Sequence, residues 1–148
     1  IEKLFDIGFV GQPTNVNKDL IMNHIKKGEI PVIAPLGIDS DSNCYNINAD
    51  TVAGFIAGTL KASKLLLLTD VAGILDRNNK LISSLSLNDA KKIVKKDFII
   101  GGMKPKILTC IDSMEKGVKK STILDGRISH SLILELFTEH GIGTQIFS

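Results

Sequence analysis

Tryptophan is absent from this sequence of 148 residues, and only one tyrosine and two cysteines occur. Cys44 and Cys110 lie far apart and belong to no C-x-x-C pair, so neither a zinc site nor a redox motif is indicated. The longest uninterrupted apolar run, Leu65 to Leu68, is far too short to span a bilayer, and no signal peptide is recognisable. We therefore expect a cytoplasmic protein with no membrane partner.

An excess of charge of one sign is also missing. The chain carries 18 basic and 16 acidic side chains, which alternate along the sequence and leave a net charge of +2. Neutralising several phosphates of a nucleic acid requires a basic stripe, so we expect no nucleic-acid partner. The nearest basic cluster has helical spacing and is typical of a solvated helix face; it consists of Lys91, Lys92, Lys95 and Lys96.

Predicted strands and helices alternate along the chain. Apolar periodicity and capping residues predict helices over residues 18–27, 51–61, 87–96, 105–116 and 129–139. Short β-branched or leucine-rich runs predict strands over residues 30–37, 44–48, 64–70, 121–126 and 144–147. This alternation predicts one α/β domain, a three-layer αβα sandwich with a mostly parallel sheet, whose ligands bind at the carboxyl ends of strands.

Polar residues concentrate in NCYNINADTVAG, residues 43–54. Side chains two residues apart on a strand point the same way, so Asn46 and Asn48 would face one ligand together. Neutral amides offer donors and acceptors that suit a polar small molecule better than a phosphate chain. Asp50 stands where the next helix begins, and the local sequence leaves open whether it caps that helix or belongs to a binding site.

Two further segments could contact a ligand. LTDVAGILD, residues 68–76, combines a strand end with Gly73, but it matches neither a P-loop nor G-x-G-x-x-G, and a plain turn remains open. IIGGMKPK, residues 99–106, places Lys104 and Lys106 at a helix start, which favours a bound phosphate. A glycine turn followed by two surface lysines is the alternative for this second segment.

Histidine chemistry is not indicated. His24, His130 and His140 have no metal-ligand spacing between them, and no Ser-His-Asp arrangement can be recognised. We therefore expect no protein-built metal site.

Five segments, taken in this order and spacing, resemble the second half of the amino acid kinase family members that phosphorylate N-acetyl-L-glutamate: FDIGFVGQPTNVN, CYNINAD, LLLLTDVAGILD, GGMKPK and ELFTEHGIGTQIF. The resemblance covers essentially the entire chain. It implies an amino acid kinase-like fold and transfer of the γ-phosphoryl group of ATP to the side-chain carboxylate, the second step of arginine biosynthesis. It also implies a requirement for Mg²⁺.

The resemblance further implies roles for individual residues. Asn46 would bind the α-carboxylate of the substrate with Asn48 beside it, and Asp50 would hold catalytic lysines in place. Lys106 would be one of these lysines and would stabilise the transferring phosphoryl group. The nucleotide pocket would be lined by Thr69, Asp70, Val71, Ala72, Gly73, Ile74, Leu75, Phe98, Ile99, Ile100, Gly102 and Met103.

By the same resemblance, residues 1–148 are expected to form the C-terminal nucleotide-binding part of a longer kinase domain. A glycine-rich phosphate loop, a second catalytic lysine and a substrate-gripping arginine would precede it, so the isolated chain is expected to be inactive. The full-length enzyme would be a homo-oligomer, and ISHSLILELFTEHGIGT implies feedback inhibition by L-arginine. Two alternatives stay open: a kinase for another amino acid or carbamate, and a non-catalytic module that binds arginine or nucleotide.

Overall fold

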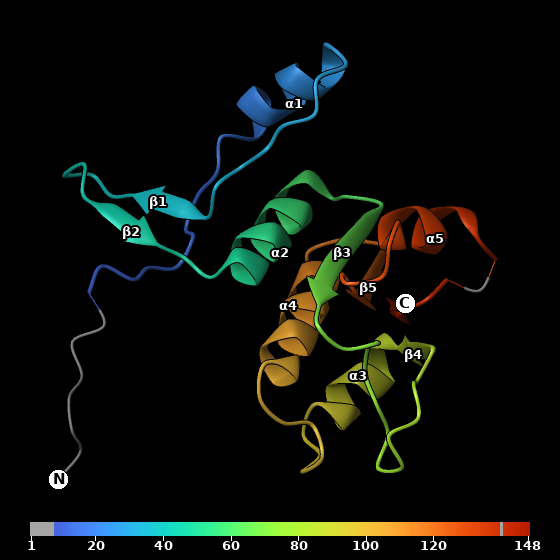
Figure 1. Ribbon diagram of the computed structural model, residues 1–148. Coiled ribbons are helices and arrows are strands. Elements are labelled where there is room, and N and C mark those ends of the chain that lie inside the picture. The colour runs from blue at the N-terminus through green and yellow to red at the C-terminus, as the bar shows by residue number, and fades with distance from the viewer. Residues whose placement is uncertain (1–7, 140) are drawn as a thin grey trace, which may run out of the picture.

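The structure is a computed structural model that describes residues 8–139 and 141–148 (Figure 1). Its N-terminal elements are α1 (Lys18–Lys26), β1 (Leu36–Ile38) and β2 (Cys44–Asn46). The remaining elements are α2 (Ala49–Leu60), β3 (Lys64–Thr69), β4 (Ser84–Ser86), α3 (Leu87–Ile93), α4 (Met103–Glu115), β5 (Lys120–Asp125), α5 (Ser131–Phe137) and β6 (Thr144–Phe147).

Four strands form the main sheet in the order β3-β5-β6-β4. The pairs β3–β5 and β6–β4 are parallel, whereas β5 and β6 run antiparallel. Ser121 of β5 contacts Ser113 of α4, and Thr122, which points to the opposite face, hydrogen-bonds Glu135 of α5. Helices therefore flank both faces, and the predicted α/β fold with a mostly parallel sheet is confirmed.

The core lies between the sheet and α4. Leu65, Leu67 and Ile123 are buried on the sheet face that Ile107 and Cys110 of α4 cover. Burial raises the pKa of the Cys110 thiol to about 12, so this cysteine is an inert core residue. Helix α2 packs closely on α4 because Gly54 has no side chain; a Cβ there would lie 2.5 Å from Cγ2 of Thr109.

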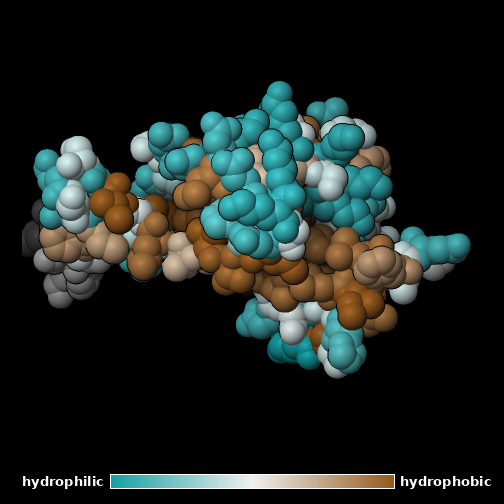
Figure 2. Space-filling view, turned by 90° about the horizontal axis from the view of Figure 1, so that it is seen from above, coloured by the Kyte–Doolittle hydropathy of each residue, from teal (hydrophilic) through white to brown (hydrophobic). Residues whose placement is uncertain are grey.

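The N-terminal arm, residues 8–47, carries α1 and the antiparallel hairpin β1–β2 away from the main sheet (Figure 1). The predicted strand over residues 30–37 is wrong in extent, because only Leu36–Ile38 is a strand. Ile30 and Val32 are 89% and 96% exposed instead of buried, since no strand among the described residues pairs with this segment. Figure 2 shows hydrophobic residues exposed on the arm and on the adjoining body.

Several other helices and strands begin or end at residues other than the predicted ones; α4, for example, spans Met103–Glu115 instead of residues 105–116. The caps were predicted correctly for α1 and α3, where Asn17 and Ser86 accept from backbone amides. Strand β4 was missed because its three residues, Ser84–Ser86, carry no strand signal beyond one leucine. Leu68 of β3 is exposed, since α5 covers its face of the sheet only in part.

No helix in the described ranges is long and apolar enough to cross a membrane.

Candidate active site

Helix α2 is capped by Asn48, whose side-chain oxygen accepts from the backbone N–H of Thr51 at 3.1 Å. Asp50, for which the sequence left a capping role open, is the second residue of the helix and does not cap it. Asn46 ends β2, and its backbone pairs with Phe9 and Gly11. Both asparagines are exposed, so their side chains reach solvent.

Asp50 and Lys106 form an ion pair between α2 and α4, with 2.7 Å between Nζ and Oδ2. The Lys106 ammonium also donates to the backbone carbonyl of Leu68 at 3.3 Å, near the carboxyl end of β3. Only 16% of the Lys106 side chain and 23% of the Asp50 side chain are exposed. The structure thus brings the two together and fixes a positive charge at a strand end, where ligands bind in such sheets.

The start of α4, which carries Lys106, also offers backbone donors. Gly102 is the N-cap of α4, no side chain caps the helix, and its first turn contains no acidic residue. Free backbone N–H groups and the helix dipole therefore favour an anion at this end. Lys104 lies in the same turn but is exposed and has no ion-pair partner among the described residues.

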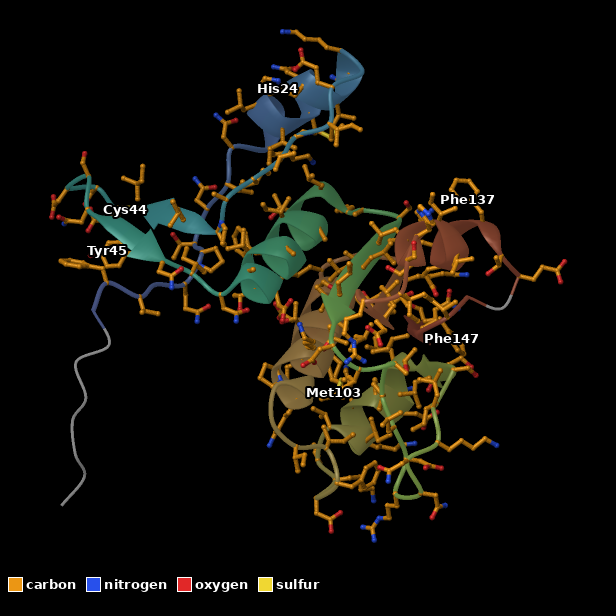
Figure 3. The ribbon with its side chains drawn as sticks, in the orientation of Figure 1. His24, Cys44, Tyr45, Met103, Phe137 and Phe147 are labelled. Atoms are coloured by element: carbon orange, nitrogen blue, oxygen red, sulfur yellow. The ribbon has the colours of Figure 1, made fainter. Side chains whose placement is uncertain are left out.

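A cavity of about 290 Å³ lies beside the start of α4. Residues from both predicted nucleotide segments line it: Val71, Gly73, Leu75, Phe98, Ile99, Ile100 and Met103. Figure 3 labels Met103 at the first turn of α4. Ile74 instead has its side chain fully buried in the core, and Thr69, Asp70, Ala72 and Gly102 lie outside the lining.

Three further residues line the cavity: Asp76, the last residue of the candidate segment 68–76, and Arg77 and Asn79, which were not expected. Arg77 and Asn79 belong to the segment DRNNK, residues 76–80, whose polar composition predicts only a turn. Asp76 holds this turn by accepting from the backbone N–H groups of Asn78 and Lys80, at 2.8 and 2.9 Å. Polar turns carry no signal for the cavity they border, because that depends on which distant segment packs against them.

A second acid lies at the carboxyl end of β5. Asp125 accepts from Nε and Nη2 of Arg127, at 3.0 and 2.8 Å, and stands beside Thr69 of β3 in the sheet. These hydrogen bonds from Arg127 hold the pKa of the Asp125 carboxyl below its usual value.

Within residues 8–139 and 141–148, no group of three or more His, Cys, Asp or Glu side chains could hold a metal ion.

A polar cavity of about 390 Å³ occupies the opposite end of the strands. Lys64 and Lys120, the first residues of β3 and β5, line it together with Glu135 and Glu139. Glu135 is buried and accepts from Thr122 and from the backbone N–H of Ile142, at 3.1 and 3.0 Å. This cavity could hold a small zwitterion with charges of both signs.

Sequence and structure comparisons place the chain among known proteins. The model of the amino acid kinase family matches residues 1–125. The acetylglutamate kinases of Acidiphilium cryptum and Parvibaculum lavamentivorans are 54% and 53% identical over 146 residues, 99% of this chain but 49% and 48% of those proteins. The chain therefore spans about half the length of these curated relatives.

Among solved structures, the N-acetylglutamate synthase of Neisseria gonorrhoeae, complexed with coenzyme A and L-arginine, superposes with a TM-score of 0.90. It is 28% identical, and the match covers 97% of this chain and 33% of that protein. The arrangement of α2, α4 and the main sheet therefore belongs to a known fold.

Proposed function

The chain belongs to the amino acid kinase family, and on this premise we propose that it forms the nucleotide-binding part of an acetylglutamate kinase. The reaction would transfer the γ-phosphoryl group of ATP to the side-chain carboxylate of N-acetyl-L-glutamate, giving N-acetyl-L-glutamyl 5-phosphate and ADP. The relatives that are more than half identical over nearly the whole chain support this assignment.

The half-buried ion pair of Asp50 and Lys106 is the observation that carries the proposal. A carboxylate attacks the γ-phosphorus without losing a proton, so the reaction needs no general base. It needs positioning and positive charge where the phosphoryl oxygens develop negative charge. Lys106 would supply that charge, and Asp50 would keep the ammonium aimed at the strand end between turnovers.

The cavity bounded by Val71, Phe98 and Met103 would accept the nucleotide base. Its mostly apolar lining suits a flat ring, and the uncapped start of α4 would receive phosphate oxygens. Mg²⁺ would accompany ATP. Since no carboxylate cage occurs in the described part of the chain, the ion would be held largely by the ATP phosphates, as Mg²⁺ commonly is.

Asn46 would bind the α-carboxylate of the acceptor. In the complete natural protein, Asn46→Ala should raise KM for N-acetyl-L-glutamate about tenfold or more, because a charge-assisted hydrogen bond is lost. KM for ATP should stay unchanged. Initial rates with each substrate varied in turn measure both quantities, and Asn43→Ala, in the loop before β2, is the matched control.

An acceptor assay tests the proposal as a whole. N-acetyl-L-glutamate should be phosphorylated at least a hundredfold faster than free L-glutamate, L-aspartate or carbamate at equal concentration. Preference for one of the other acceptors would favour a different kinase of the family. Nucleotide binding without turnover on any acceptor, in the complete protein, would favour a non-catalytic module.

L-arginine would bind the polar cavity at the opposite end of the strands. The carboxylates of Glu135 and Glu139 could receive a guanidinium, and Lys64 and Lys120 could receive a carboxylate. The related synthase from Neisseria gonorrhoeae was crystallised with L-arginine, which supports this ligand. We therefore propose that arginine inhibits the complete enzyme.

Glu139→Gln should raise the arginine concentration for half-inhibition about tenfold, because one carboxylate that faces the guanidinium loses its charge. Glu115→Gln, an exposed glutamate of α4 paired with Lys91, should leave the arginine response as it is. Rates measured against arginine concentration test this. Full activity of the unmodified enzyme at saturating arginine would refute the regulatory proposal, but the kinase assignment would still stand.

A further inference from the structure

Two loops meet at the edge of the cavity beside the start of α4. The first is the turn 76–80, which Asp76 holds through two backbone amides. The second is the segment 97–98, which precedes α4. Arg77 joins them, because its Nη2 donates to Oδ1 of Asp97 at 2.8 Å. Arg77 and Phe98 both line the cavity, so this contact crosses its edge.

The guanidinium of Arg77 also lies over the ring of Phe98, with its Cζ 5.5 Å from the ring centroid. The Arg77 and Asp97 side chains are 67% and 78% exposed. Exposed ion pairs contribute little to stability, so the fold does not depend on this arrangement. Its effect is to hold a planar cation beside an aromatic ring at the opening of a mostly apolar cavity.

A planar cation in this place suits an aromatic base. A guanidinium is weakly hydrated and stacks on aromatic faces, whereas an ammonium is a compact, strongly hydrated charge. Arginine has five N–H donors, and Asp97 takes one of them. The remaining donors could reach the acceptor nitrogens of a purine, while Phe98 packs against its ring.

We propose that Arg77 contacts the purine base of the bound nucleotide and that Asp97 positions it. This inference rests on the proposed nucleotide site and adds a base-binding residue outside the segments that the sequence indicated. Its consequence is specific: removing Arg77 weakens the binding of ligands that carry a base, and leaves the binding of a bare phosphate chain as it was.

Titration calorimetry on the complete natural protein tests this with two probes, AMP-PNP and inorganic tripolyphosphate. Arg77→Ala should weaken AMP-PNP binding about tenfold, from the loss of stacking and cation–π contacts. Tripolyphosphate should bind as it does to the unmodified protein. Arg77→Lys should bind AMP-PNP nearly as weakly as the alanine variant, because it keeps the charge but not the plane.

Asp97→Asn should weaken AMP-PNP binding about threefold, since it leaves Arg77 in place but removes the charge that orients it. In kinetics, KM for ATP should rise while kcat stays the same, which a general loss of stability would not produce. Lys95→Ala removes one positive charge from a neighbouring exposed position outside the cavity, and should bind both probes normally.

The outcomes separate this inference from the proposed function. Normal AMP-PNP binding by Arg77→Ala would overturn the base contact and leave the kinase assignment intact. An equal loss of tripolyphosphate binding, or normal AMP-PNP binding by Arg77→Lys, would mean that Arg77 acts only through its positive charge. Either result would also overturn the base contact. Failure of the unmodified protein to bind AMP-PNP would overturn both.

Discussion

Lys106→Ala in the complete natural protein should lower kcat by about three orders of magnitude, because a preorganised charge at the transferring phosphoryl group is lost. The side chain is only 16% exposed and held at 2.7 Å from Asp50, so the proposed reaction should meet little reorganisation cost when it uses this charge. Binding of AMP-PNP should weaken far less than kcat falls. Initial-rate kinetics and calorimetry on one preparation measure both.

Lys104→Ala is the matched control for this experiment. It removes the same charge from the same turn of α4, two residues away, but from an exposed position without an ion pair among the described residues. It should change kcat by at most a few-fold. A Lys106→Ala enzyme that retains a tenth of its kcat, or a Lys104→Ala enzyme that loses as much as Lys106→Ala, would contradict the role given to Lys106.

Asp50→Asn should lower kcat about a hundredfold. The amide keeps the shape of the carboxylate but attracts the ammonium much less, so Lys106 would spend less time aimed at the phosphoryl group. Because we propose that the two residues act as one unit, Asp50→Asn combined with Lys106→Ala should be little worse than Lys106→Ala alone.

The control for Asp50 is Asp112→Asn. Asp112 pairs with Lys116 at 2.6 Å near the C-terminal end of α4, and the two side chains are 61% and 46% exposed. Loss of this pair should leave kcat unchanged and cost well under about 1 kcal/mol of stability. Additive losses in the Asp50→Asn and Lys106→Ala double variant would mean that the two residues act independently, contrary to the proposed mechanism.

The local sequence correctly predicted elements that are marked by a helix cap or by a run of apolar residues. Asn17 and Ser86 cap helices where polar residues precede apolar periodicity, and the leucine run of β3 forms a strand. Local signals also gave a wrong prediction for residues 30–37. The β-branched residues of this segment have strand propensity, but a strand forms only where another strand pairs with it. Propensity therefore predicted too long a strand in the N-terminal arm.

The motifs in combination indicated the amino acid kinase family, and the family match over residues 1–125 confirms it. The candidate residues of the site were also named from motifs, and the resemblance implied that Asp50 holds Lys106, but no local pattern gave the geometry of that contact. Asp50 and Lys106 are 56 positions apart, and their contact exists because Gly54 lets α2 approach α4. No periodicity within either helix encodes that approach.

By itself, then, the sequence determined the fold class, the family and the residue types available at the site, because these follow from local periodicity and from motifs read in order. Only the tertiary structure decided that Asn48 rather than Asp50 caps α2, that Ile74 belongs to the core, and that Arg77 reaches Phe98. Each of these depends on which segments distant in the chain pack together, and packing is a property of the whole fold.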